Sequence, residues 1–305
     1  MSSTLVGTEI GGEFTIIKYI ASGSFGDVYA GINKTTKESV ALKIPIKNEN
    51  KNGEKYILEE LKIYENLHQN KIGLYSHTNS THIDNLHIPK IKIIKDKKLD
   101  KNILIMDLLG DSLDVKLHKS KCKKLPLKTI ILLAIQMIEA VKYIHNNGYI
   151  HRDLKPDNFV MDIKNKRLYL IDFGLAKKYI KKLNKGHKFC GTGRYASIAA
   201  HKGYEQSRKD DLEAIAYLLI YLFNGSLPWM NIKNKNKEEK YKLMMKKKIE
   251  TSEEKLCDQL PRQFLVYLNY VKTLDFNEDP LYDKLIGMFK QLFKNKNYKN
   301  TSFEW

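Results

Sequence analysis

Two carboxylates in the middle of the chain, with two polar neighbours, have the residue types and spacing best suited to chemistry. Asp153 and Asp172 stand 19 positions apart, and Lys155 and Asn158 follow the first of them closely. Each group adjoins an apolar stretch, so a strand or turn can present it to a cleft. Carboxylate and amide oxygens bind hard divalent cations, and a lysine can neutralise a phosphate. These residues therefore predict a place where a metal ion, a base and a phosphate meet.

A glycine-containing segment near the N-terminus could supply the phosphate-binding part of such a site. Alternating β-branched and aromatic residues predict three strands, at residues 14–20, 27–32 and 39–44. Between the first two strands, Gly23 and Gly26 flank a phenylalanine. Glycines allow the backbone to turn its N–H groups toward a phosphate. A simple hairpin turn without a ligand is the plainer alternative, and this segment alone does not decide between them.

A lysine and a glutamate are candidates for a buried ion pair near this segment. Lys43 lies at the end of the third predicted strand after three apolar residues, which indicates an inward position. Residues 54–68 have the apolar spacing of a helix, and Glu60 lies within its apolar face. Glu60 could therefore reach Lys43. Glu59 is the alternative partner.

The rest of the chain contains elements that would position these residues. They are a loop at 69–87, a buried strand at 103–109, a buried helix at 129–145 and a β-hairpin at 163–171. The hairpin has Asn165 in its turn and places Asp172 at a strand end. Asp210 and Asp211 precede another apolar helix, whose free N–H groups an aspartate would cap. The lysine-rich residues 231–248 are most simply interpreted as a solvated face.

Composition limits the classes of protein to consider. The 305 residues are 42 % hydrophobic and carry a formal net charge of +18, which indicates a globular chain with acidic partners. A codon bias toward Lys, Asn and Ile is the alternative explanation of the charge. Three widely spaced cysteines argue against disulfides and zinc, and for an intracellular location in cytoplasm or nucleus. The longest apolar run, at 212–223, is too short to span a membrane. We expect no specific nucleic-acid contact.

Several segments together carry a family resemblance. The glycine loop, V-A-L-K at 40–43, H-R-D-L-K-P-D-N at 151–158 and D-F-G at 172–174 occur in the order and spacing of a protein kinase. The casein kinase I family of serine/threonine kinases is more specifically similar in four further segments. They are L-L-G-D-S-L at 108–113, G-T-G-R-Y-A-S-I at 191–198, E-Q-S-R-K-D-D-L-E at 205–213 and G-S-L-P-W at 225–229. The resemblance extends from Phe14 to the last three residues.

The resemblance implies an α+β, two-lobed protein kinase fold. The expected N-lobe, at residues 1–106, has a small antiparallel sheet and one main helix. A hinge at 107–112 leads to a larger, mostly helical C-lobe at 113–305. The whole would be one kinase domain over about residues 14–305.

The resemblance also implies catalytic roles, with ATP and Mg²⁺ as cofactors and Ser/Thr hydroxyls as acceptors. Phosphoryl transfer depends on positioning and charge neutralisation. Asp172 and Asn158 would bind Mg²⁺. Asp153 would orient the attacking hydroxyl or accept its proton, and Lys155 would neutralise the γ-phosphate.

A further set of residues would bind the nucleotide. Lys43, held in place by Glu60, would contact the α- and β-phosphates, and Met106 would be the gatekeeper beside the adenine. The other residues expected around ATP are Ile20, Ala21, Ser22, Gly23, Ser24, Phe25, Gly26, Val28, Ala41, Asp107, Leu109, Val160 and Ile171.

The resemblance predicts acidic or already phosphorylated protein substrates and a monomeric enzyme. Arg194 and Lys240 match positions where basic residues of the family bind an anion, and Arg152 and Lys177 would form a second group. An arginine beside a lysine suits a phosphate.

The chain also departs from the family. Ala21 replaces the first glycine of the loop and Ala199 replaces an asparagine, and the 69–87 loop is longer than usual. We expect activity to survive the change at Ala21. Ala199 removes any hydrogen bond that the asparagine side chain would make, and the loop has no assigned role. A pseudokinase scaffold on the same fold is the main alternative. A small-molecule phosphotransferase ranks lower, because such enzymes lack the G-T-x-R-Y segment.

Overall fold

The chain folds into two compact units, which are described separately. The computed structural model describes residues 5–23, 25–48, 51–69 and 87–305. Unit 1 comprises Met1–Leu109 and Asp172–Gly174, and unit 2 comprises Gly110–Ile171 and Leu175–Trp305. The expectations for Ser24 and for most of the 69–87 loop lie outside the described residues.

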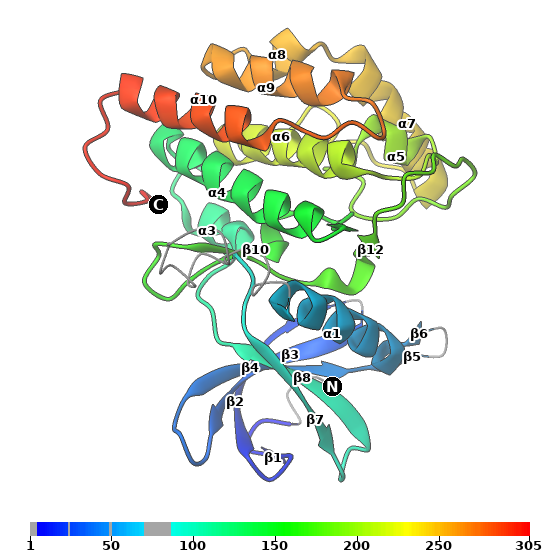
Figure 1. Cartoon of the computed structure of the whole chain (residues 1–305), viewed down its shortest axis with the longest axis vertical. Helices are drawn as coiled ribbons and strands as arrows, with labels where there is room; N and C mark the ends of the chain where they lie inside the picture. The colour runs from blue at the N-terminus through cyan, green and yellow to red at the C-terminus, as the bar shows by residue number, and fades with distance from the viewer. Residues whose placement is uncertain (1–4, 24, 49–50, 70–86) are drawn as a thin grey trace. The chain divides into compact units, whose positions relative to one another are not determined.

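Unit 1 is built around an antiparallel sheet with the strand order β1-β2-β3-β4-β8-β7 (Figure 1). Its strands are β1 (Glu9–Ile10), β2 (Phe14–Ser22), β3 (Gly26–Asn33), β4 (Ser39–Pro45), β7 (Ile91–Asp96) and β8 (Lys101–Asp107). The short strands β5 (Lys47–Asn48) and β6 (Lys51–Asn52) precede helix α1 (Gly53–Gln69). The three predicted N-terminal strands and the predicted helix at 54–68 are confirmed. The strand predicted at 103–109 ends two residues earlier.

The alternation of side chains along these strands separates two faces of the sheet. One face forms an apolar core that includes Phe14, Tyr29, Leu42 and Ile105. The neighbouring residues in sequence point to the opposite face, because successive strand residues alternate sides. That opposite face carries Lys43 and, as shown below, three other predicted nucleotide-binding residues.

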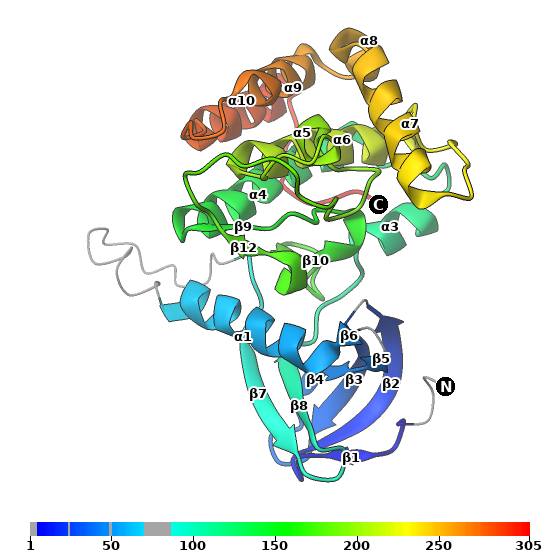
Figure 2. The same cartoon turned by 90° about the vertical axis from the view of Figure 1, so that its right-hand side faces the viewer.

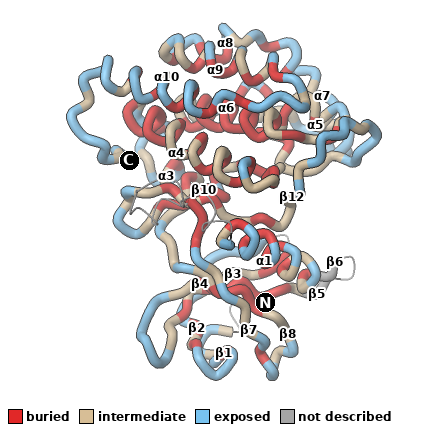
Figure 3. The backbone as a smooth tube through the Cα atoms, in the orientation of Figure 1, coloured by how far each residue is buried: buried red, intermediate tan, exposed pale blue. Residues whose placement is uncertain are grey.

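Unit 2 is mostly helical. Its helices are α3 (Leu113–Lys119), α4 (Leu127–Asn146), α5 (Ile198–His201), α6 (Arg208–Asn224), α7 (Lys237–Glu250), α8 (Glu253–Cys257), α9 (Arg262–Thr273) and α10 (Tyr282–Asn295). Helix α4 packs against α6 and α10, and α6 also packs against α9. Helix α6 is buried along nearly its whole length, as its all-round apolar sequence predicts (Figure 3). None of the described helices is both long and apolar enough to cross a membrane.

Short strands and turns connect these helices. They are β9 (Tyr149–Ile150), the 3-10 turn Pro156–Asn158, β10 (Phe159–Met161), β11 (Leu168–Leu170), the 3-10 turn Phe173–Leu175 and β12 (Lys177–Lys178). The predicted β-hairpin at 163–171 was wrong in its first strand. Strand β10 pairs with β11, and residues 162–167 form the turn. Asp162 makes this turn, because its carboxylate accepts hydrogen bonds from the N–H groups of Lys166 and Arg167.

The start of α6 also differs from the prediction. The helix begins at Arg208, so Asp210 and Asp211 lie inside its first turn. Asp210 still takes part in capping the N-terminus of the helix, because its carboxylate accepts the N–H of Ser207 at 2.7 Å. Asp211 points elsewhere and supports the loop described below.

Candidate active site

The glycine segment of unit 1 forms the turn between β2 and β3. The Gly23 N–H donates to the Gly26 carbonyl at 2.9 Å, which closes the turn. A Cβ atom at Gly26 would lie 2.7 Å from the Ile44 carbonyl oxygen, so only glycine fits there. Ala21 lies in β2 opposite Val28, and its φ is not in the left-handed region. The alanine in place of the first glycine is therefore accommodated without backbone strain.

Strand register places four of the predicted nucleotide-binding residues of unit 1 on one face of the sheet. Val28 pairs with Lys43, and Ala41 pairs with Met106. Paired residues share a face, as do residues two apart in a strand, so all four side chains point the same way. This small apolar surface beside one lysine is suited to a purine ring and its phosphates. Val160 and Ile171 belong to unit 2, where Val160 is buried in β10.

Lys43, Glu60 and Asp172 form a buried charge cluster in unit 1. The Lys43 Nζ lies 2.7 Å from Glu60 Oε2 and 2.9 Å from Asp172 Oδ1. Glu59, the alternative partner, is exposed and lies near Lys55 instead. Burial disfavours the ammonium form, but the two carboxylates outweigh it and raise the pKa of Lys43 above its usual range. Lys43 is therefore charged at neutral pH and held at a fixed point.

The backbone around Asp172 is held in an uncommon conformation. Asp172 has a φ of +64°, in the left-handed region that few non-glycine residues adopt. Glu60 Oε1 accepts the N–H of Phe173 at 3.1 Å, and the Phe173 ring packs edge-on against Tyr64. A Cβ at Gly174 would lie 2.8 Å from the Phe25 ring, so a larger residue there would displace that ring. Such strain persists where the surrounding structure enforces it, which is common at functional sites.

Asp153 occupies a defined position in the loop after β9 in unit 2. It is buried, and its two carboxylate oxygens have different partners. Oδ2 accepts from Lys155 Nζ at 2.8 Å, and Oδ1 accepts from the Thr192 hydroxyl at 2.7 Å. Asn158 Nδ2 donates to the Asp153 carbonyl at 2.9 Å, which leaves the Asn158 side-chain oxygen as the acceptor atom. The structure therefore brings Asp153, Lys155 and Asn158 together, as their sequence spacing predicts.

Asp211 supports this loop from helix α6. Its carboxylate accepts the N–H groups of His151 at 2.7 Å and Arg152 at 2.9 Å, and lies 2.9 Å from His145 Nε2. Burial works against the charged form, yet the hydrogen bonds from His145 and the His151 N–H hold the pKa of Asp211 below its usual value. These bonds hold Arg152 at a φ of +66°. The sequence predicts only a helix-capping role for Asp211, because hydrogen bonds to distant residues leave no local pattern.

Thr192 was not among the predicted site residues, although its hydroxyl contacts Asp153. We expect Thr192→Val to lower kcat about ten- to a hundredfold, because the carboxylate loses one of its two anchors and can rotate out of position. Steady-state kinetics with purified protein measures this. Thr192→Ser keeps the hydroxyl and should stay within about threefold of the parent. Equal losses in both variants would contradict a role for this hydrogen bond.

The four residues predicted to bind anions differ in their contacts. The Arg194 guanidinium lies over the rings of Tyr195 and Tyr221, and its Nη1 donates to the Tyr195 hydroxyl at 3.3 Å. Lys240 lies in the first turn of α7. Arg152 Nε donates to the Leu175 carbonyl at 2.8 Å. Lys177 forms an ion pair with Glu205 at 3.0 Å, so its charge is already paired with a carboxylate of the chain.

Lys248 is not among the predicted site residues, because it lies in the lysine-rich run that was interpreted as a solvated face. Its side chain is only 1 % exposed, and its Nζ donates to the carbonyls of Gly193, at 3.0 Å, and Ala196. The ammonium lies over the rings of Tyr217 and Trp229. Burial lowers the pKa of Lys248 to about 7. The one feature of the local sequence that indicates burial of Lys248 is Met244, which lies on the same face of the helix.

Two of the predicted metal-binding residues carry donor atoms of the kind that magnesium prefers. Asp172 offers a carboxylate in unit 1, and Asn158 offers an amide oxygen in unit 2. Among the described residues, no group of three or more His, Cys, Asp or Glu side chains could hold an ion. Mg²⁺ binds carboxylate and amide oxygens, commonly takes one or two protein ligands and completes its shell with water and substrate phosphates.

Comparison with known families identifies the class of protein. Residues 14–301 match the family model described as "Protein kinase domain". This range is most of the chain, so the chain belongs to the protein kinase family. The predicted α+β fold is confirmed: unit 1 is the antiparallel N-lobe and unit 2 the helical C-lobe. Members of this family are phosphotransferases that use ATP, typically with Mg²⁺, and act on proteins.

Proposed function

We propose that this chain is an active serine/threonine kinase of the casein kinase I type, which transfers the γ-phosphoryl group of Mg·ATP to protein hydroxyls. The observation that carries this proposal is the buried cluster in which Lys43 contacts both Glu60 and Asp172. A pseudokinase scaffold needs no such arrangement of charges. The casein kinase I assignment rests on the resemblance of the segments at 108–113, 191–198, 205–213 and 225–229.

Each residue has a distinct part in the proposed reaction. Lys43 binds the α- and β-phosphates through its fixed ammonium group. Asp172 and Asn158 hold Mg²⁺, which neutralises charge on the phosphates when it is bound. Asp153 accepts a hydrogen bond from the attacking hydroxyl, and Lys155, at 2.8 Å from Asp153, neutralises the γ-phosphate.

The preference proposed for acidic or pre-phosphorylated substrates rests on Arg194 and Lys240. Arg194 lies in the G-T-G-R-Y segment that also contains Thr192, the partner of Asp153. A half-buried arginine on aromatic rings keeps its charge and a fixed orientation, which suits a phosphate or carboxylate. The net charge of +18 favours the same substrates. A monomer in cytoplasm or nucleus is the accompanying proposal.

A pair of matched peptides tests the function and this preference together. The two peptides differ only in one serine upstream of the acceptor, which is phosphorylated in one and free in the other. The parent chain should phosphorylate both on Ser or Thr but not on Tyr, with kcat/KM about tenfold or more higher for the phosphorylated peptide. Arg194→Ala combined with Lys240→Ala should remove this difference selectively.

The control is Lys294→Ala combined with Lys299→Ala, which removes two exposed lysines near the end of α10. This control should show the same difference in kcat/KM between the two peptides as the parent. An equal loss on both peptides in the Arg194/Lys240 double variant would overturn the substrate preference. An absence of turnover on every peptide, with ATP still bound, would favour the pseudokinase.

A further inference from the structure

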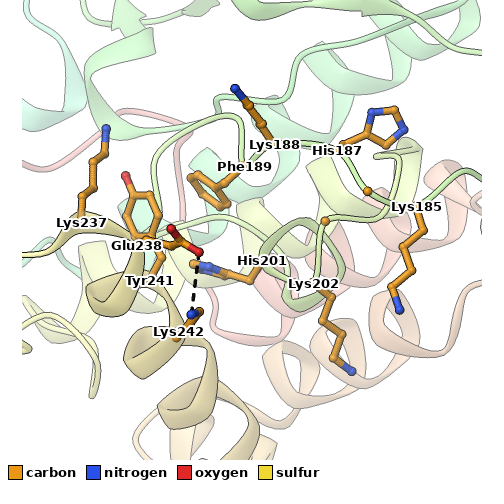
Figure 4. Close-up of a pocket in the computed structure, with 12 residues that line it drawn as sticks. Lys185, His187, Lys188, Phe189, His201, Lys202, Lys237, Glu238, Tyr241 and Lys242 are labelled. Carbon is orange, nitrogen blue, oxygen red and sulfur yellow. Dashed lines mark ion pairs between the residues drawn. The ribbon is translucent and has the colours of Figure 1, made fainter.

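A basic pocket in unit 2 has no part in the proposed reaction. It has a volume of about 940 Å³ and lies between residues 185–189, residues 201–203 and the start of α7 (Figure 4). Helix α7 packs against α5, so these segments come together through tertiary contacts (Figure 2). The volume is in the range of pockets that hold a compact ligand or a few side chains.

The floor of the pocket is aromatic. The Phe189 ring stacks on His201 with centroids 4.9 Å apart and lies 4.5 Å from Tyr241. Burial, assisted by the nearby Lys248 charge, lowers the pKa of His201 to about 4, so this imidazole is neutral at pH 7. The three rings, which lie close together in Figure 4, therefore form an uncharged surface. Such a surface favours an apolar group of a ligand.

The rim of the pocket is strongly positive. Five lysines line it, against a single glutamate, Glu238, which lies 3.7 Å from Lys242. Among the described residues, no carboxylate lies within 4.0 Å of the ammonium groups of Lys185, Lys202 or Lys237. In Figure 4, Lys185 and Lys202 extend on one side of the aromatic floor and Lys237 on the other. Positive groups on both sides of an apolar floor are complementary to an acidic ligand with an apolar centre.

The pocket adjoins the G-T-G-R-Y segment. His201 Nε2 lies 3.1 Å from the Gly193 carbonyl, and a Cβ at Gly193 would lie 2.6 Å from the Tyr241 ring. Neither Arg194 nor Lys240 lines the pocket. It is therefore a separate site from the anion site proposed above, although both are attached to the same segment.

We propose that this pocket docks an acidic segment of the protein substrate, with one apolar or aromatic side chain on the Phe189–Tyr241 floor and flanking carboxylates on Lys185, Lys202 and Lys237. This inference rests on the proposed kinase function, since it extends the contact with a protein substrate beyond the acceptor site. A concave pocket with rings packed against one another suits a side-chain anchor. A nucleic acid needs an extended basic track and open ring faces for stacking, and a membrane needs a broad apolar face.

Two peptides with the same acceptor sequence test the docking. One also carries, through a flexible glycine–serine linker, a segment of acidic residues around a single phenylalanine. The parent chain should have a kcat/KM about tenfold higher for the extended peptide. The triple variant Lys185→Glu, Lys202→Glu and Lys237→Glu should lose this advantage and retain the parent value on the short peptide.

The matched control is Lys294→Glu, Lys296→Glu and Lys299→Glu, which changes the charge equally. These exposed lysines lie in the last turn of α10 or just after it, and the end of α10 is far from α7 (Figures 1 and 2). It should keep the advantage of the extended peptide. Equal behaviour of the two triple variants would overturn the proposal, because net charge alone would then account for the effect. A similar loss on the short peptide would overturn it too, since the pocket would then belong to the acceptor site.

A binding measurement separates this proposal from the kinase function. Fluorescence anisotropy with the labelled acidic segment alone, without ATP, should give a dissociation constant that rises about tenfold or more in the pocket variant and not in the control. This result stands even if no peptide is phosphorylated. Tighter binding of a single-stranded oligonucleotide through the same three lysines would overturn the peptide assignment.

Discussion

Asp172→Asn is expected to lower kcat about a thousandfold or more, which corresponds to roughly 4 kcal/mol of transition-state stabilisation. The carboxylate is the proposed Mg²⁺ ligand of unit 1, and its replacement by an amide removes one negative charge from the site. Charge neutralisation at the phosphates is the main source of catalysis in phosphoryl transfer. Steady-state assay of purified protein with Mg·ATP and an acidic peptide measures the effect.

The fold should survive this substitution. The asparagine oxygen can still accept from Lys43 Nζ, which lies 2.9 Å from Asp172 Oδ1 in the parent. The midpoint temperature of thermal unfolding should therefore change by only a few degrees.

Asp283→Asn makes the same chemical change at an 83 % exposed side chain of α10 and should leave kcat unaltered. A folded Asp172→Asn protein that is as active as the parent would show that the metal assignment is wrong. A parent chain with no turnover would instead point to the pseudokinase.

Lys248→Met is expected to lower the free energy of unfolding by about 2–4 kcal/mol, because the carbonyls of Gly193 and Ala196 lose their buried donor. Methionine keeps the length of the side chain and its packing on Tyr217 and Trp229. The lost hydrogen bonds therefore dominate the change. Chemical denaturation monitored by circular dichroism measures it. We also expect kcat to fall, because these carbonyls flank Arg194.

The pH dependence of stability provides a second readout for Lys248. Burial lowers its pKa from 10.5 to about 7, so between these values the folded protein binds fewer protons than the unfolded chain. The contribution of Lys248 to the free energy of unfolding therefore rises with pH from about 7 to about 10. This slope should be absent in Lys248→Met.

Lys247→Met is the matched control, since Lys247 is exposed in the same turn of α7. It should keep both the parent stability and the parent slope. If Lys248→Met were as stable as Lys247→Met and had the same pH dependence as the parent, the buried hydrogen bonds would have no energetic role.

Local patterns were sufficient to predict most elements and the grouping of the candidate catalytic residues in one loop. Residues such as Asp153, Lys155 and Asn158 lie within one short loop, so their spacing in sequence limits their spacing in space. The period of apolar residues likewise predicts β2, β3, β4 and α1, because the buried side of each element repeats at its own period. The first strand of the β10–β11 hairpin was misplaced, because the capping interactions of Asp162 make a turn where alternation suggested a strand.

Local sequence patterns were therefore enough to predict the protein kinase family, the fold class and the candidate catalytic residues. They did not predict which of the many charged residues are buried or what each one contacts. Lys248 and Lys247 are adjacent and chemically identical, yet one is buried under the G-T-G-R-Y segment and the other is exposed. Asp211 and Thr192 likewise acquire their partners from segments 60 and 39 residues away. The physical reason is that burial and long-range hydrogen bonds depend on the packing of distant elements, which no local pattern encodes.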